Sequence, residues 1–144
     1  MKTVKQAGLI AVLLFICTVF SVDAQDTTKT AKRDTVIDGK EIFIIVETRP
    51  EFSGGDEARI RFLQENLVYP KEAWKKKLQG KVVIGFVVEA DGSLTDFSVV
   101  KSVSSDLDAE ALRVCKLMPN WTPGSQKGNP VRVRFVMPIT FSLQ

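Results

Sequence analysis

The side chains that could perform acid–base or nucleophilic chemistry are few in this sequence. Histidine is absent, which excludes Ser-His-Asp and Cys-His sites and removes the commonest zinc ligand. Cys115 has no histidine or second cysteine in the mature domain to activate it, so we expect a packed structural thiol. Several carboxylates fall at predicted turns and at a helix start, where solvation and capping explain them: Glu89, Asp91, Asp96, Asp106, Asp108 and Glu110. We therefore predict no enzyme, no metal site and no cofactor.

The chemistry that remains is backbone hydrogen bonding along the last predicted strand, residues 131–143. Its odd positions are apolar without a break, and its even positions are mostly polar or small, which is the period of a half-buried strand. Pro138 cannot donate to a ladder and is therefore typical of an edge strand. An edge strand can accept another chain. The candidate partner-binding residues are Val131, Arg132, Val133, Arg134, Phe135, Val136, Met137, Pro138, Ile139 and Thr140.

The elements that must position this strand form an α+β domain. Helices are predicted at 57–66, 71–78 and 107–117, and strands at 81–90, 93–101 and 131–143. The third strand runs parallel to the second, so it can pair antiparallel only with the first. We expect a two-layer fold with a three-stranded antiparallel sheet in the order 2-1-3 and helices on one face.

Local signals set the predicted ends of these elements. Asp56 is expected to cap the first helix, and Ser105 or Asp106 the third. Adjacent Val99 and Val100 predict a bulge. A small hairpin is expected from Thr35 to Glu47 on an Asp-Gly turn, in a place that the sequence leaves open.

The N-terminal segment predicts export. A positive start, an apolar run at 7–22 and a small-residue exit at Ala24 indicate a signal peptide over 1–24, with an inner-membrane anchor through 7–22 as the alternative. Residues 25–34 follow as a flexible linker, 35–49 as the hairpin extension and 50–144 as the main domain. A formal charge of only +3 and an exported location argue against nucleic acid as a partner.

The chain also carries a set of short motifs, preceded by a lead-in at 50–55, whose residues are Tyr69, Pro70, Ala73, Gly80, Asp91, Gly92, Leu107, Ala111, Trp121, Pro123 and Gly124. In order and spacing these motifs resemble the C-terminal domain of TonB energy transducers, and the lead-in resembles a large subgroup of that family. The resemblance implies a periplasmic module that takes the TonB box, an extended segment of an outer-membrane TonB-dependent receptor, onto its last strand during energy-dependent transport. The chain departs from full members of that family, which have a membrane anchor and a long proline-rich spacer, in its expected signal peptide and its short linker without proline, so we expect a stand-alone member.

Three alternatives stay open at this point. The edge strand could make a homodimer or serve an envelope scaffold instead of receiving a receptor. Arg132 and Arg134 could contact the partner or protect the edge from aggregation. The N-terminal hairpin could pair with the last strand and occupy the partner's place. No small-molecule substrate is expected in any of these cases.

Overall fold

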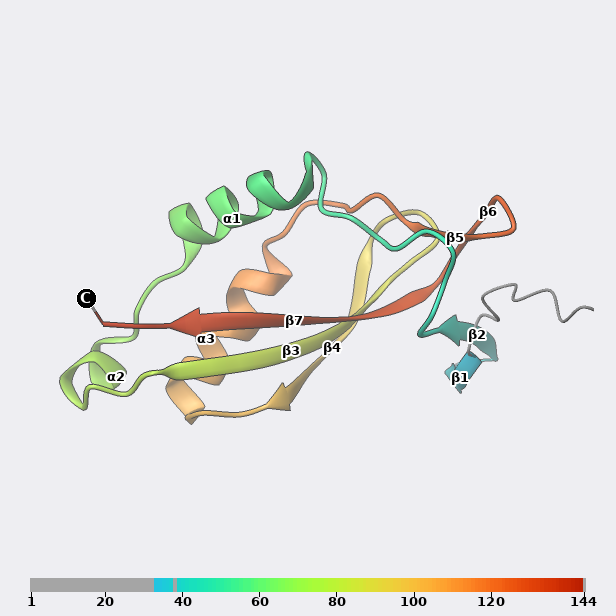
Figure 1. Ribbon diagram of the computed structural model, residues 1–144. Helices are drawn as coiled ribbons and strands as arrows, with labels where there is room; N and C mark the ends of the chain where they lie inside the picture. The colour runs from blue at the N-terminus through green and yellow to red at the C-terminus, as the bar shows by residue number, and fades with distance from the viewer. Residues whose placement is uncertain (1–32, 38, 144) are drawn as a thin grey trace, which may run out of the picture.

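The computed structural model of the protein describes residues 33–37 and 39–143 and confirms the predicted α+β class (Figure 1). Helices α1 and α3 lie against a strongly curved sheet. The elements in chain order are β1 (Arg33–Ile37), β2 (Lys40–Phe43), α1 (Gly55–Asn66), α2 (Lys71–Lys75), β3 (Gly80–Val88), β4 (Leu94–Lys101), α3 (Ser105–Lys116), β5 (Gly124–Gln126), β6 (Asn129–Val131) and β7 (Val133–Phe141).

The main sheet has five strands in the order β1-β2-β7-β3-β4, so the prediction of three strands is wrong in number. β3 lies between β4 and β7 and pairs antiparallel with both. β2 joins the outer side of β7 in parallel through the pair Phe43 and Val133, which makes the sheet mixed. The sequence could not place β2, because one parallel pair between segments 90 residues apart leaves no local pattern.

The core lies between β3 and α3. Every other residue of β3 from Val82 to Val88 has no exposed surface, as expected for the inward face of a central strand. The apolar stripe of α3, including Leu107 and Ala111, is equally buried. An aromatic cluster extends this core toward β7, where Phe86 and Phe135 each contact the ring of Trp121, with ring centroids 5.4 and 4.9 Å away. The cluster supports β7 from its inner face.

Two predicted helix caps are wrong because both helices begin earlier than expected. Gly54, with a φ of 93°, is the N-cap of α1, and Asp56 instead forms an ion pair with Arg59 at 3.1 Å. A left-handed backbone is accessible to glycine at little cost, so the chain turns into the helix there. Ser104 caps α3, and its Oγ accepts a hydrogen bond from the Leu107 N–H at 3.3 Å.

The second helix is shorter than predicted. α2 ends at Lys75, and Lys77 adopts a φ of 53°, which ends the helix and returns the chain toward β3. Leu78 then packs against the main core from outside the helix. Pro70 is the N-cap residue of α2.

The strands also differ in detail from the expected ranges. Val83 pairs with Lys101 and Ile84 with Val99, so Val100 is the extra residue of the predicted bulge. The predicted last strand is divided at Arg132 into β6 and β7, and β6 pairs antiparallel with β5. β2 ends at Phe43, after which Ile44 is exposed.

Candidate functional site

The inward and outward side chains of β7 alternate as the sequence predicts. Met137, Ile139 and Phe141 are at most 2% exposed and pack in the main core, whereas Val133, also 2% exposed, packs with Phe43 and Val46. Val136, Pro138 and Thr140 are exposed on the other face. β7 is therefore anchored by one face, and its other face is open to solvent.

The backbone of β7 also alternates, and one hydrogen bond sets its phase. The Phe43 N–H donates to the Arg132 carbonyl at 2.9 Å, so that carbonyl points away from β3 and toward β2. In an extended strand, alternate residues direct their N–H and C=O to the same side. The even residues Val136, Pro138 and Thr140 therefore present their backbone groups to the outer flank, and the odd residues present theirs to β3.

Among the described residues, the outer flank of β7 is unpaired beyond Val133. β3 pairs with β7 along its whole length, from Val133 to Phe141. On the other side, the pairing that the structure describes ends at Val133. The outward groups from residue 136 to 140 comprise the carbonyls of Val136, Pro138 and Thr140 and the N–H groups of Val136 and Thr140. Pro138 has no N–H to offer, and its position facing outward leaves the ladder to β3 intact.

β4 lies at the opposite end of the sheet but is a poorer template. Its pairing with β3 contains two register shifts. Asp96 adopts a φ of 52°, which interrupts the extended backbone. These register shifts, and an exposed charged side chain such as Asp96, hinder the addition of another strand. β7 lies between β2 and β3 in the strand order and is not the edge strand that the sequence predicts, but among the described residues its flank beyond Val133 is unpaired and more regular than that of β4.

The two arginines at the start of the candidate site are held by the protein itself. Arg132 makes a two-point ion pair with Glu89, with its Nε 2.6 Å and its Nη2 3.0 Å from the carboxylate oxygens. The hydrogen bond from Arg132 lowers the pKa of Glu89 from its ordinary value, more than burial raises it. Arg134 donates to the Ser98 Oγ at 3.1 Å across the sheet face. Arg132 therefore reaches the residue after β3, and Arg134 reaches β4.

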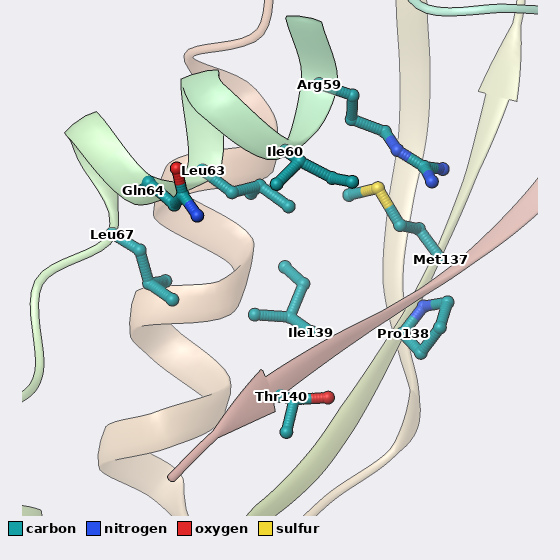
Figure 2. A pocket seen from close by; sticks show the side chains of 9 residues that line it. All are labelled: Arg59, Ile60, Leu63, Gln64, Leu67, Met137, Pro138, Ile139 and Thr140. Carbon is teal, nitrogen blue, oxygen red and sulfur yellow. The ribbon is translucent and has the colours of Figure 1, made fainter. Parts of the chain in front are cut away.

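A groove lies between α1 and the open flank of β7 (Figure 2). Its volume is about 400 Å³, and most of its surface is apolar. Figure 2 shows Ile60 and Leu63 of α1 facing Met137 and Ile139 of β7 across it. The full lining is Arg59, Ile60, Leu63, Gln64, Leu67, Met137, Pro138, Ile139 and Thr140.

The α1 wall of this groove is the part of the site that sequence analysis missed. Ala58, Phe62, Leu63 and Leu67 form the apolar face by which this segment packs against the core. Ile60 lies outside that face and is 51% exposed. The spacing of Ile60, Leu63 and Leu67 is itself helical, so a second apolar stripe was present in the sequence as a signal.

The family-motif residues lie in the core, at turns and at the ends of elements, and they do not line the groove. Ala73, Leu107 and Ala111 have no exposed surface, and Trp121 is 3% exposed. The remaining motif residues occupy turns and element ends. Tyr69 packs edge-on against Phe141 with ring centroids 5.7 Å apart, Pro70 begins α2, Gly80 begins β3, Asp91 and Gly92 form the turn after β3, and Gly124 begins β5 after Pro123.

Asp91 and Glu110, two of the candidate carboxylates, hold local structure. Asp91 accepts hydrogen bonds from the N–H and Oγ of Ser93, at 2.9 and 2.6 Å. Glu110 pairs with Arg113 and also accepts the N–H of Val68 at 2.7 Å. Within residues 33–37 and 39–143, no three acidic, cysteine or histidine side chains gather as a metal site would require. None of the helices described is long and apolar enough to cross a membrane.

Comparison with known proteins identifies the domain. The family described as Gram-negative bacterial TonB protein C-terminal matches residues 65–143, which is more than half of the chain. Protein TonB from two strains of Helicobacter pylori is 36% identical over 77 residues, which cover 53% of this chain and 26% of that protein. The chain thus spans about a quarter of the length of these relatives.

Solved structures of the Helicobacter pylori TonB C-terminal domain are also similar to this chain. Two NMR structures of different fragments have TM-scores of 0.47 and 0.45, each at 29% identity. The first alignment covers 59% of this chain and 77% of that one, and the second covers 60% and 91%. On the family match over residues 65–143, this chain belongs to the family of Gram-negative bacterial TonB protein C-terminal domains.

Proposed function

We propose that this domain binds an extended segment, the TonB box, of an outer-membrane TonB-dependent receptor by adding it as a strand to β7. The observation that carries the proposal is the open flank of β7 after Val133, beside the complete ladder to β3 on the other flank. Strand addition needs a regular edge with unpaired backbone groups, and residues 136–140 supply them. Membership of the TonB family supports a receptor as the source of the added strand.

We expect the domain to bind the segment reversibly and with moderate affinity. Each backbone hydrogen bond nets about 0.5–1.5 kcal/mol, and association itself costs about 4 kcal/mol or more. The three carbonyls and two N–H groups available between Val136 and Thr140 therefore support weak binding on their own. Side-chain contacts must supply the rest of the affinity and all of the sequence preference.

The proposed setting is the periplasm, where the domain takes part in energy-dependent transport across the outer membrane. The signal peptide over residues 1–24, its alternative as a membrane anchor, and most of the linker over 25–34 lie outside the described residues. Mass spectrometry of the N-terminus of the protein isolated from the envelope tests this setting. A mature chain that starts at Gln25 supports release into the periplasm, and a retained segment at 7–22 supports anchoring.

Binding is tested by NMR titration of the folded protein with a synthetic TonB-box peptide. The proposal expects saturable shifts of the Val136 and Thr140 amides. A Val136→Pro variant removes one outward N–H and should weaken binding by about 2- to 10-fold. Val136→Thr keeps that N–H and the branched side chain and serves as the matched control. Absence of any amide shift at millimolar peptide would overturn the proposal.

A second candidate function is self-association through the same edge, since Val136 is 49% exposed beside unpaired backbone groups. Two copies would then pair β7 with β7. Analytical ultracentrifugation without peptide separates the two functions. A dimer that Val136→Pro abolishes favours self-association, and a monomer across the concentration range favours the receptor segment.

A further inference from the structure

We infer that the groove between α1 and β7 selects receptor segments that carry two apolar side chains two residues apart. This inference rests on the proposed addition of a strand to β7 and states which segments the site prefers. It assigns a binding role to α1, and to Ile60 in particular.

The direction of the added side chains follows from strand geometry. A strand added to the open flank lies about 4.8 Å from β7, and residues directly opposite one another point to the same face. Met137 and Ile139 point toward the helices and are at most 2% exposed. The two added residues opposite them therefore also point toward α1. They enter the groove that Figure 2 shows.

The groove has the size and surface that two such side chains need. An apolar cavity of about 150 Å³ is enough for a benzene molecule. The groove measures about 400 Å³ and is open along β7, so it has room for two aliphatic side chains. Its far wall is the stripe Ile60, Leu63 and Leu67.

Of the residues in this wall, Ile60 contributes least to the packing of the domain. Its side chain is 51% exposed and is not among the residues packed against the core, whereas Leu63 and Leu67 do pack there. An added aliphatic side chain would cover Ile60 and gain from removing apolar surface from water. A cationic side chain at the same place would lose hydration and would lie in the same groove as Arg59, so it would be disfavoured.

The other face of the added strand meets a different environment. Its residues would lie beside Val136, Pro138 and Thr140, which are all exposed. Polar or charged side chains remain hydrated there. The site therefore distinguishes the two faces of the segment and prefers apolar residues at positions i and i+2 of an otherwise polar stretch.

The experiment uses two synthetic peptides of about eight residues with the same composition, both capped at their ends. Each is rich in threonine, carries a lysine at either end and contains two leucines. In one peptide the leucines stand at i and i+2, and in the other at i and i+3, which places them on opposite faces of a strand. We expect the first to bind about 5- to 10-fold more tightly, because only it places both leucines in the groove.

Two matched variants locate the effect. Ile60→Gln should remove most of the preference for the i, i+2 peptide. Leu117→Gln is the control, because Leu117 is 53% exposed, lies at the end of α3 and does not line the groove. It should leave both affinities unchanged. Methyl shifts of Leu63 and Leu67 on addition of the i, i+2 peptide report directly on occupancy of the groove.

The outcomes separate this inference from the proposed function. If the TonB-box peptide shifts the Val136 and Thr140 amides but the two leucine peptides bind equally, the groove does not select and the inference is overturned. The same holds if Ile60→Gln leaves the preference intact. If neither the TonB-box peptide nor the leucine peptides shift those amides, strand addition to β7 itself is wrong.

Discussion

Phe43 of β2 and Val133 of β7 form the parallel pair at which the closed part of β7's outer flank ends. The Phe43 N–H donates to the Arg132 carbonyl at 2.9 Å, and Phe43 packs with Val46 and Val133 in a small cluster separate from the main core. In the described part of the chain, β2 makes no further pair along β7. The hairpin therefore occupies the outer flank at Arg132 and Val133, and its described residues leave 136–140 uncovered.

The first prediction concerns this border. A Phe43→Ala variant should loosen the hairpin, because Phe43 is one of the three buried residues of the small cluster. The affinity for a TonB-box peptide should stay within about twofold, because binding uses residues 136–140. Titration calorimetry measures the affinity, and hydrogen exchange at Lys40–Phe43 shows that the hairpin has loosened. A gain of tenfold or more would mean that the hairpin does occupy the partner's place.

The second prediction concerns Pro138, which interrupts the outward donors of β7. Pro138→Val and Pro138→Ala each supply an N–H where the ladder to an added strand lacks one. Both should tighten peptide binding by about 2- to 10-fold, the value of one backbone hydrogen bond. Thr140→Val changes a neighbouring side chain without adding a donor and should have no such effect. Weaker binding by both Pro138 variants would contradict the outward direction assigned to this residue.

The third prediction is a pH dependence of stability that comes from the Glu89–Arg132 pair. The pKa of Glu89 is lowered in the folded protein from its ordinary value of 4.5, chiefly by the hydrogen bond from Arg132. The pair therefore stabilises the fold above pH 4.5, and this contribution is lost as the pH falls through the lower folded-state pKa. Glu89→Gln should cost about 1–2 kcal/mol at neutral pH and little in acid. Urea unfolding at a series of pH values measures the difference.

The control for that prediction is Glu72→Gln, which removes an exposed ion pair. Glu72 lies 2.9 Å from Lys75, and their side chains are 60% and 67% exposed. Solvent screening limits such a pair to about 0.5 kcal/mol or less. Equal losses for the two variants, or a loss for Glu89→Gln that is independent of pH, would show that the ion pair is not the cause.

The fourth prediction concerns the turn after β3. Gly92 has a φ of 87°, and a Cβ there would lie 2.0 Å from the Trp121 carbonyl oxygen. Gly92→Ala should therefore destabilise the protein by more than about 2 kcal/mol, the sum of backbone strain and a backbone clash. Gly128→Ala is the matched control, because the φ of Gly128 is 76° and no atom of the described residues lies within 4 Å of a Cβ placed there. This variant should lower the free energy of unfolding by only about 1 kcal/mol, the strain of a left-handed backbone that carries a Cβ. Similar losses in thermal unfolding would contradict the contact with Trp121.

The fifth prediction concerns the buried thiol of Cys115. Its side chain has no exposed surface, and burial raises its pKa to about 12. In a Cys17→Ser variant, where Cys115 is the remaining thiol, the native protein should resist iodoacetamide near neutral pH. The same protein in denaturant should be labelled completely. Fast labelling of the native state would show that the helix α3 opens or that the thiol is reactive.

The sequence by itself determined the local features of this protein and its family. The alternation in 131–143 fixed which residues of β7 face the core, because a strand has a period of two. The adjacent valines located the bulge at Val100. The ordered motifs identified the TonB C-terminal domain, since each marks a turn, a helix start or a buried position that the fold needs.

Only the tertiary structure decided what surrounds β7. Pro138 indicated an edge strand, but whether another segment covers that edge depends on residues far away in the chain, such as Phe43. The groove needs α1 to lie at a particular distance from β7, which no local pattern encodes. Arg132 reaches Glu89 for the same reason: contact between residues 43 positions apart is set by the packing of whole elements.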